Sequence, residues 1–175
     1  MIGEIRDLET AQIAVQASLT GHLVLATLHT NDAASAVTRL ADMGVVPYLL
    51  SSSLLGVLAQ RLVRTLCPAC REATAPDEAE HRLLARMGAA ALSRIHRPRG
   101  CESCNQGGYR GRTGIYELMV VDDAVRRAIH DRAGEDAVRE AMRAAGAATL
   151  RSDGVRWLAD GTTSLAELLR VTRDG

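Results

Sequence analysis

The sequence predicts an α/β fold, followed by a small four-cysteine module and then by a mostly helical C-terminal region. Three observations support this order: an unbroken apolar run at residues 23–28 lies between two helical patterns, two Cys-x-x-Cys pairs follow in the middle of the chain, and helical segments dominate the final third. With 175 residues, the chain has room for one medium domain, or for part of a domain and an appended module.

The first helical pattern and the apolar run give the N-terminal part its α/β character. Asp7 is expected to cap a helix over residues 8–19, and Gly21 is expected to end it. The run Leu23–Leu28 follows directly and is bounded by Gly21 and by polar residues. An apolar run of this length without alternation is typical of a strand that is buried on both faces of a parallel sheet.

Two further helices are expected before the first cysteine. Asn31 is expected to cap a helix that runs to about Met43 and ends at Gly44. Pro47 is expected to open another helix, which extends through Leu54 or beyond. The inward face of the first of these helices is predicted to carry Val37, Leu40 and Ala41.

The region after the last cysteine is predicted to be mostly helical. One strand is expected over residues 114–120. Helices are expected to begin near Asp122, near Glu135 and after Thr163.

Composition and charge exclude several function classes. The formal net charge is zero, with 21 basic and 21 acidic residues, so no global field recruits nucleic acid. All the basic residues counted here are arginine, and lysine is absent from the sequence. The phosphate-binding loop of nucleotide hydrolases requires a lysine that reaches the terminal phosphates, and a Schiff-base enzyme requires one as its nucleophile. This sequence cannot supply either group.

The sequence also predicts a cytoplasmic location. Residues 1–7 lack the basic region, apolar stretch and cleavage site of a secretory signal. No apolar run approaches the roughly 20 residues that a membrane-spanning helix requires. Because thiols stay reduced in the cytoplasm, the four cysteines are expected to be metal ligands rather than disulfide partners.

The cysteines form two pairs, Cys67-x-x-Cys70 and Cys101-x-x-Cys104. Two residues between ligands allow both thiolates of a tight turn to point at one ion, and two such turns complete a tetrahedron around zinc. Four sulfur ligands leave no open coordination position, so the predicted zinc site is structural rather than catalytic. Buried or paired thiols and an iron–sulfur cluster are the alternatives that the same spacing allows.

Three short motifs lie within the first 31 residues: Gly3-Glu4-Ile5-Arg6-Asp7, Gly21-His22-Leu23 and Thr27-Leu28-His29-Thr30-Asn31. Together they resemble the Walker B segment and histidine box of the ATPases that drive type II secretion and type IV pilus assembly. Three later segments are also similar to this family: residues 60–64, 108–117 and 153–172. The resemblance therefore covers essentially the whole chain, and residues 13–19 and 51–60 favour the type II secretion branch of the family.

The resemblance implies roles for three residues. Glu4 matches the Walker B acid, which in the family helps to position magnesium and to activate the water that attacks the γ-phosphate. His29 matches the box histidine near the γ-phosphate, and His22 is a further catalytic candidate. Without the family motif, a lone histidine beside an apolar strand is more often structural, and this alternative stays open for both histidines.

The resemblance also implies how the chain is organised. Residues 1–66 correspond to the C-terminal part of a RecA-like P-loop ATPase domain, residues 67–104 to a tetracysteine zinc module, and residues 105–175 to a mostly helical C-terminal region. The Walker A loop is outside this sequence. The chain is thus expected to be a truncated, C-terminal fragment of a longer ATPase that binds ATP and Mg²⁺, and to be inactive alone.

The family further implies a function and partners. The intact parent is expected to couple ATP hydrolysis to pseudopilus assembly and to protein export by type II secretion. It is expected to form a hexamer on the cytoplasmic face of the inner membrane, in contact with membrane-platform proteins and without nucleic acid. Two alternatives remain: a fragment of a type IV pilus assembly ATPase, and a zinc-stapled interaction module that hydrolyses nothing.

Overall fold

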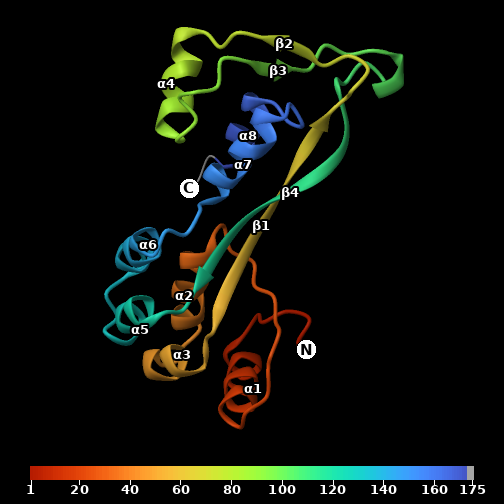
Figure 1. Ribbon diagram of the computed structural model, residues 1–175. Coiled ribbons are helices and arrows are strands. Elements are labelled where there is room, and N and C mark those ends of the chain that lie inside the picture. The colour runs from red at the N-terminus through yellow and green to blue at the C-terminus, as the bar shows by residue number, and fades with distance from the viewer. Residues whose placement is uncertain (173–175) are drawn as a thin grey trace. The chain divides into compact units, whose positions relative to one another are not determined.

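The structure is a computed structural model that describes residues 1–172, and Figure 1 shows the order of its helices and strands. The chain divides into two compact units. Unit 1 comprises Met1–Ala59 and Glu117–Ala147, whereas unit 2 comprises Gln60–Tyr116 and the described residues from Ala148 onward. Each unit is therefore built from segments that are far apart in the sequence.

Unit 1 is mainly helical. Its helices are α1 (Leu8–Leu19), α2 (Ala33–Asp42), α3 (Pro47–Ser53), α5 (Asp123–His130) and α6 (Glu135–Ala144). Helix α3 packs against α1 and α5, and α6 packs against α2 and α5. Their buried side chains form a common core, which includes Val15, Val37, Leu40, Leu50, Val125, Ile129 and Val138.

Unit 2 combines short strands with helices. These elements are β2 (Glu72–Thr74), α4 (Glu78–Arg86), β3 (Ile95–Arg97), the 3-10 turn η1 (Glu102–Cys104), α7 (Leu150–Ala159) and α8 (Leu165–Val171). Strands β2 and β3 are antiparallel, with Glu72 opposite Arg97 and Thr74 opposite Ile95. Helices α7 and α8 contact each other and β3. The core of this unit includes Val63, Leu84, Ile95, Ile115, Leu158 and Leu168.

Two long strands contribute residues to both units. Strands β1 (Gly56–Leu66) and β4 (Tyr109–Val120) form a two-stranded sheet, and Figure 1 shows that they run in opposite directions. Along β4 the side chains of Ile115, Glu117 and Met119 are buried, whereas those between them are exposed. This alternation places one face of the strand on the cores, as expected for a half-buried antiparallel sheet.

The first predicted helix is confirmed as α1. The side chain of Asp7 caps it by accepting a hydrogen bond of 2.8 Å from the backbone N–H of Thr10. The helix ends at Leu19, and Gly21 follows with φ of 90°, a conformation that glycine adopts at little cost. For this helix, the local signals in the sequence were sufficient.

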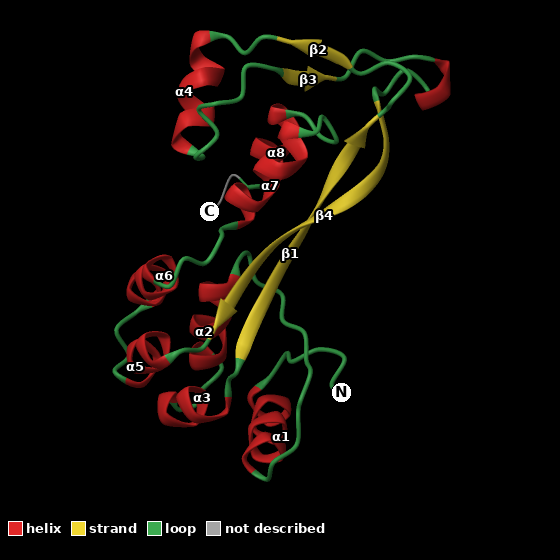
Figure 2. Ribbon diagram, viewed as in Figure 1, coloured by secondary structure: helices red, strands yellow, loops and turns green. Residues whose placement is uncertain are grey.

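The prediction of a buried strand at Leu23–Leu28 is wrong in this structure. Figure 2 shows the described residues between α1 and α2 as a loop, and the exposed fractions of Leu23 and Leu25 are 75% and 59%. Two backbone hydrogen bonds, Ile2 N–H to Leu25 O and Ile5 N–H to Thr27 O, tie this loop to the N-terminal residues. A doubly buried strand requires a neighbouring strand on each side and a covering layer on each face. The inter-segment backbone hydrogen bonds found for residues 23–28 in the described part of the chain both go to this short segment.

Helix α2 begins one residue later than predicted. Its cap is Asp32, not Asn31, because the Asp32 carboxylate accepts a hydrogen bond of 2.8 Å from the Ser35 N–H. Val37 and Leu40 are buried as expected, but Ala41 is exposed. Gly44 follows the helix with φ of 99°, in agreement with its predicted role as the stop.

Strand β1 and helix α7 are elements that the sequence analysis did not predict. Helix α3 ends at Ser53, and the strand begins at Gly56 where the helix had been expected to continue. The hydrophobic pattern over β1 is ambiguous, because its apolar residues do not all lie on one buried face. Leu58 and Leu62 are exposed, whereas Val63 is buried. Pairing with β4, which lies far along the chain, decides the conformation. The predicted strand at 114–120 belongs to β4, which begins earlier, at Tyr109.

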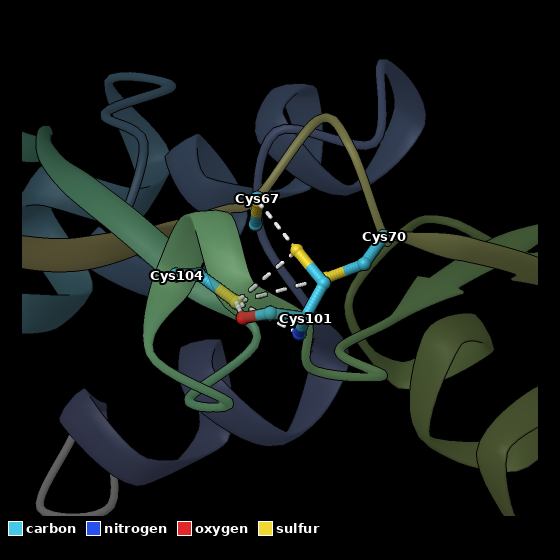
Figure 3. A group of neighbouring side chains, drawn as sticks. All are labelled: Cys67, Cys70, Cys101 and Cys104. Atoms are coloured by element: carbon cyan, nitrogen blue, oxygen red, sulfur yellow. Dashed lines mark hydrogen bonds between the residues drawn. The ribbon is translucent and has the colours of Figure 1, made fainter.

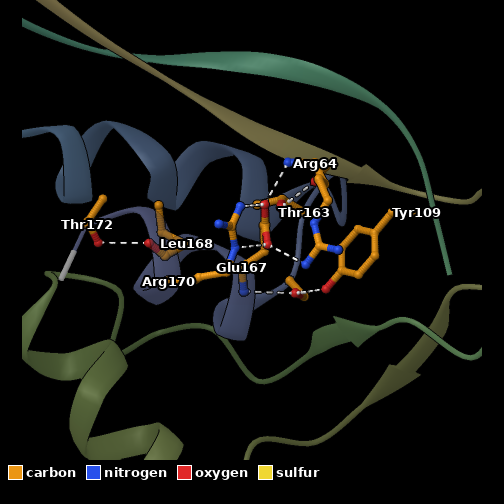
Figure 4. Close-up of polar contacts among 8 residues, drawn as sticks. Arg64, Tyr109, Thr163, Glu167, Leu168, Arg170 and Thr172 are labelled. Atoms are coloured by element: carbon orange, nitrogen blue, oxygen red, sulfur yellow. Dashed lines mark hydrogen bonds and ion pairs between the residues drawn. The ribbon is translucent and has the colours of Figure 1, made fainter. Parts of the chain in front are cut away.

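A buried carboxylate connects α8 to β1 within unit 2. The side chain of Glu167 has no exposed surface, and Figure 4 shows that it accepts hydrogen bonds from Arg64 and Arg170. The guanidinium of Arg64 donates to Glu167 over 2.7 Å and also lies 4.1 Å from the centre of the Tyr109 ring. Burial alone would raise the pKa of Glu167, but the hydrogen bonds from Arg170 and Arg64 lower it to about 2, from an ordinary value of 4.5.

Replacing this carboxylate is expected to destabilise unit 2. In Glu167→Gln the charge-assisted hydrogen bonds are lost while the site stays buried, so the free energy of unfolding at pH 7 should fall by about 2 kcal/mol. Because the pKa of Glu167 is lowered in the folded chain, the ionised carboxylate contributes fully to the free energy of unfolding at pH values above its ordinary pKa of 4.5. This contribution is lost as the pH falls toward about 2. Urea denaturation of the unaltered chain and of Glu167→Gln should therefore show a difference in the free energy of unfolding that shrinks as the pH is lowered over this range.

A matched control is Glu140→Gln, because Glu140 forms an exposed pair with Arg143 at 3.7 Å. We expect this change to alter the free energy of unfolding by less than about 0.5 kcal/mol. Equal effects of the two substitutions at pH 7 would contradict a special role for Glu167.

Candidate functional site

The first candidate site is an acid–histidine pair in unit 1. The Oε1 atom of Glu4 lies 2.9 Å from Nε2 of His29, and Oε2 accepts a hydrogen bond of 2.6 Å from Nε of Arg6. The Glu4 side chain is 20% exposed, whereas that of His29 is 88% exposed. Two residues predicted from separate motifs are thus brought together, with the imidazole open to solvent.

The loop that carries His29 is held beside the segment that carries Glu4. The backbone N–H of Ile5 donates to the carbonyl of Thr27 over 2.9 Å. The hydroxyl of Thr27 also donates to the carbonyl of Gly3. These contacts fix the two segments on either side of the pair, so Glu4 and His29 meet even though no regular sheet forms between them.

The Glu4 carboxylate is ionised at neutral pH. The hydrogen bond from Arg6 lowers its pKa, burial opposes this change, and the charge of Arg6 and the neighbouring His29 lower it further. An ionised carboxylate beside an imidazole can accept a proton from water or contribute an oxygen ligand to a divalent cation. The pair therefore has the chemistry of a general base or of a magnesium-positioning group.

His22, the third predicted catalytic residue, lies at the other end of the same loop. Its Nδ1 atom is 3.1 Å from the hydroxyl of Thr20, and its side chain is exposed. The structure gives it this partner, and does not join it to Glu4 or His29. Its catalytic role stays a prediction.

A buried polar cluster next to this site was missed by sequence reasoning. Asp32, which is 4% exposed, pairs with Nη2 of Arg139 on α6 at 2.7 Å. Glu117 on β4 accepts a hydrogen bond of 2.9 Å from the N–H of Ala33, the first residue of α2. Asp32 had a detectable local signal, because it precedes Ser35 at the spacing of a capping box. No local pattern identifies its partner, 107 residues away.

The second candidate site is a tetracysteine centre in unit 2, shown in Figure 3. The four sulfur atoms all lie within 4.8 Å of one another. The Cys67–Cys101 sulfur distance is 4.0 Å, and the Cys70–Cys104 and Cys101–Cys104 distances are 3.8 Å. A tetrahedral zinc ion with Zn–S bonds of about 2.3 Å requires sulfur atoms separated by about 3.8 Å. The donor set therefore fits zinc.

Backbone hydrogen bonds shape the turn that carries Cys104. Its sulfur accepts from the N–H groups of Cys101 at 3.3 Å and Gly108 at 3.2 Å. The N–H of Cys67 in turn donates to the carbonyl of Gly108 over 2.9 Å, which joins the two cysteine turns. Gly108 has φ of 72°, and a β-carbon there would lie 2.4 Å from Cβ of Pro98. Glycine is thus required at this close approach.

The thiols of the centre differ in acidity. Burial raises the pKa of Cys104, but the N–H groups of Cys101 and Gly108 lower it to about 7. Burial and the neighbouring thiols raise the pKa of Cys70 to about 11. Because zinc binds thiolates, an ion that enters this centre has to displace protons, and its affinity depends on pH.

Comparison with known proteins identifies the family. Residues 1–170 match the type II/IV secretion system protein family, and the chain belongs to it. It is 62% identical to the type II secretion system protein HxcR of Pseudomonas aeruginosa, over 99% of this chain and 33% of that protein. It is 58% identical to the type II secretion system ATPase E of Vibrio cholerae, over 99% of this chain and 34% of that protein.

Solved structures show the same fold at lower identity. The pilus retraction motor PilT with bound ADP matches with a TM-score of 0.64 and 23% identity, over 99% of this chain and 40% of that one. The Legionella pneumophila ATPase DotB matches with a TM-score of 0.63 and 21% identity, over 99% of this chain and 38% of that one.

The chain spans about a third of the length of the curated relatives. Among the described residues, none of the helices is both long and apolar enough to cross a membrane.

We expect one zinc ion per chain at the tetracysteine centre. Cys70→Ser should abolish stoichiometric zinc and lower the melting temperature by more than about 10 °C, because metal binding supplies folding free energy. Metal analysis and thermal denaturation of protein grown with added zinc measure both quantities.

Ser103→Ala is the control, because Ser103 is an exposed residue between Cys101 and Cys104, in the other cysteine turn of the same centre. This variant should retain its zinc and its melting temperature. A chain without zinc, or a Cys70→Ser protein that keeps both properties, would show that the centre is not a structural zinc site.

Proposed function

We propose that this chain is the C-terminal part of a secretion ATPase that couples ATP hydrolysis to pseudopilus assembly and to protein export by type II secretion. The observation that carries this proposal is the contact between Glu4 and His29 at 2.9 Å, because these residues belong to the motifs that resemble a Walker B segment and a histidine box. Relatives with 52–62% identity, named for type II secretion, support the choice of system.

In the proposed mechanism Glu4 acts on the attacking water and on the magnesium ion. Its ionised carboxylate is suited to accept a proton from the water or to hold the ion through a coordinated water. His29 would lie near the γ-phosphate, where an imidazole can stabilise developing negative charge. His22 is proposed as a further member of the site, at the end of the loop. ATP and Mg²⁺ would be bound mainly by the rest of the longer protein, since this chain has no lysine.

The proposed organisation follows the family. Residues 1–66 would complete a RecA-like ATPase domain, residues 67–104 would form the zinc module, and residues 105–175 would form the C-terminal region. The zinc ion would have a structural role, because four thiolates occupy its coordination sphere. No step of hydrolysis is assigned to it.

The proposed setting is also that of the family. The longer protein would assemble as a hexamer and bind proteins of the inner-membrane secretion platform from the cytoplasmic side. The balanced formal charge offers no argument for a nucleic-acid partner. A role in type IV pilus assembly is the second candidate, but the pilus motor of known structure is only 23% identical to this chain.

The chain alone should not hydrolyse ATP. The lysine and the backbone cradle that hold the phosphates of a nucleotide are outside its sequence, so affinity for ATP should also be too weak to measure at micromolar concentrations. Phosphate-release assays and calorimetry on the purified chain test this expectation. Turnover that disappears in Glu4→Gln would contradict it.

A chimera in which this chain replaces the matching third of the Vibrio cholerae ATPase E is expected to hydrolyse ATP. In the chimera, Glu4→Gln should lower kcat by at least about 100-fold and change the Kd for ATP by less than about threefold, because the amide cannot accept a proton. The control is Glu9→Gln, since Glu9 is exposed in the first turn of α1.

A chimera that hydrolyses nothing, under conditions where the unaltered relative is active, would support the non-hydrolysing interaction module instead. Equal activity of the Glu4→Gln and Glu9→Gln proteins would refute the role of Glu4 and leave the family membership untouched.

A further inference from the structure

The cluster at the N-terminal end of α2 has more ionic contacts than a helix start requires. Nη2 of Arg139 lies 2.7 Å from Oδ2 of Asp32, and the same guanidinium pairs with Glu135. The Asp32 and Arg139 side chains are 6% and 26% exposed. A pair this well shielded from water is costly to break, because either partner left alone is a poorly solvated charge.

Asp32 joins three parts of unit 1. Its Oδ1 atom accepts from the Ser35 N–H at 2.8 Å and so caps α2, while its Oδ2 atom binds Arg139 on α6. Its carbonyl accepts a hydrogen bond of 3.2 Å from the hydroxyl of Thr30. Burial would raise the pKa of Asp32, but the hydrogen bonds from Ser35 and Arg139 keep it below its ordinary value. The carboxylate is therefore charged whenever the cluster is assembled.

The free N–H groups of a helix start can bind an anion, but here carboxylates already accept hydrogen bonds from two of them. The N–H of Ala33 donates to Glu117 on β4, and the N–H of Ser35 donates to Asp32. With carboxylates at both positions, a phosphate would meet negative charge. This end of α2 thus serves as an anchor for the chain that enters it.

The chain that enters α2 is the loop that carries His29, and His29 lies three residues before the cap residue Asp32. On the other side of His29, the loop is fixed by the hydrogen bonds between Thr27 and the segment around Gly3. The His29 side chain is 88% exposed, with Glu4 as its ion-pair partner. Few contacts of its own hold the imidazole, so its position depends on the two fixed ends of the loop.

We propose that Asp32 and Arg139 are positioning residues for His29, which hold the α2 end of its loop against α6. This inference rests on the proposed function, in which His29 acts near the γ-phosphate. It gives α6, which lies outside the motifs that resemble the ATPase site, an influence on hydrolysis that acts through His29. A displacement of about 1 Å of a positioned group is enough to cost a large factor in rate.

The first test measures the loop in the chain itself, without any activity. Hydrogen–deuterium exchange of Arg139→Met should be at least about tenfold faster than in the unaltered chain at residues 29–35, and unchanged in α1. Arg139→Lys, which retains a positive charge for Asp32, should restore most of the protection. Arg143→Met is the control, because Arg143 is an exposed residue of the same helix. Unchanged exchange at residues 29–35, or an equal rise throughout unit 1, would overturn the proposal.

The second test is a double-mutant cycle of His29 and Arg139 in the chimera. Arg139→Met should lower kcat by about tenfold to 100-fold and change KM by less than about twofold. In the His29→Ala background the same substitution should cost less than about twofold further, because its effect passes through His29. Arg139→Lys should recover kcat to within about threefold of the unaltered chimera, and Arg143→Met should retain it.

The outcomes separate this inference from the proposed function. Losses of kcat that multiply in the double variant would overturn the positioning role and leave the role of His29 intact. An active chimera whose kcat is unchanged by His29→Ala would overturn the role of His29 and, with it, the positioning role of Asp32 and Arg139. If the contact between Asp32 and Arg139 is merely structural, Arg139→Met should lower the melting temperature, and its loss of kcat should multiply with that of His29→Ala. The specific change in exchange at residues 29–35 should then be absent.

Discussion

The pairing of β1 with β4 is the interaction on which the internal order of both units depends. In unit 1, β4 delivers Met119 to the core and Glu117 to the first N–H of α2. In unit 2, β1 ends next to Cys67, whose N–H donates to Gly108 just before β4 begins. Backbone hydrogen bonds between strands that are distant in the sequence thus set the spacing of the cysteine turns and supply a buried partner to a helix cap.

The buried carboxylates show how the chain uses charge away from water. Asp32, Glu117 and Glu167 are all nearly inaccessible, and each accepts at least one hydrogen bond from a backbone N–H. Arginine supplies the counter-charge for Asp32 and Glu167, and its planar group can bind a carboxylate through two donors. Because an unpaired charge is costly in such places, these contacts select one arrangement of the elements rather than merely adding stability.

The two candidate sites differ in how much of each lies within this chain. All the protein ligands of a tetrahedral zinc ion are present and converge in unit 2. The acid–histidine pair, in contrast, has an open imidazole, and the sequence has no lysine that could bind the phosphates of a nucleotide. A metal site needs only its ligands, whereas hydrolysis of a nucleotide needs groups that bind the phosphates as well as the group that activates water. This difference fits a chain that spans a third of the length of its relatives.

The sequence by itself determined what depends on near neighbours. The Asp7 cap and the glycine stops follow from spacing because their partners lie within a few residues, and the grouping of four cysteines follows because two Cys-x-x-Cys turns can bind one ion. The tertiary structure alone decided that Leu23–Leu28 is a loop, that residues 56–66 form a strand, and that Arg139 meets Asp32. An apolar run has no fixed conformation until its neighbours are present, and an ion pair across 107 residues leaves no local pattern. These features depend on contacts that only the folded chain brings together.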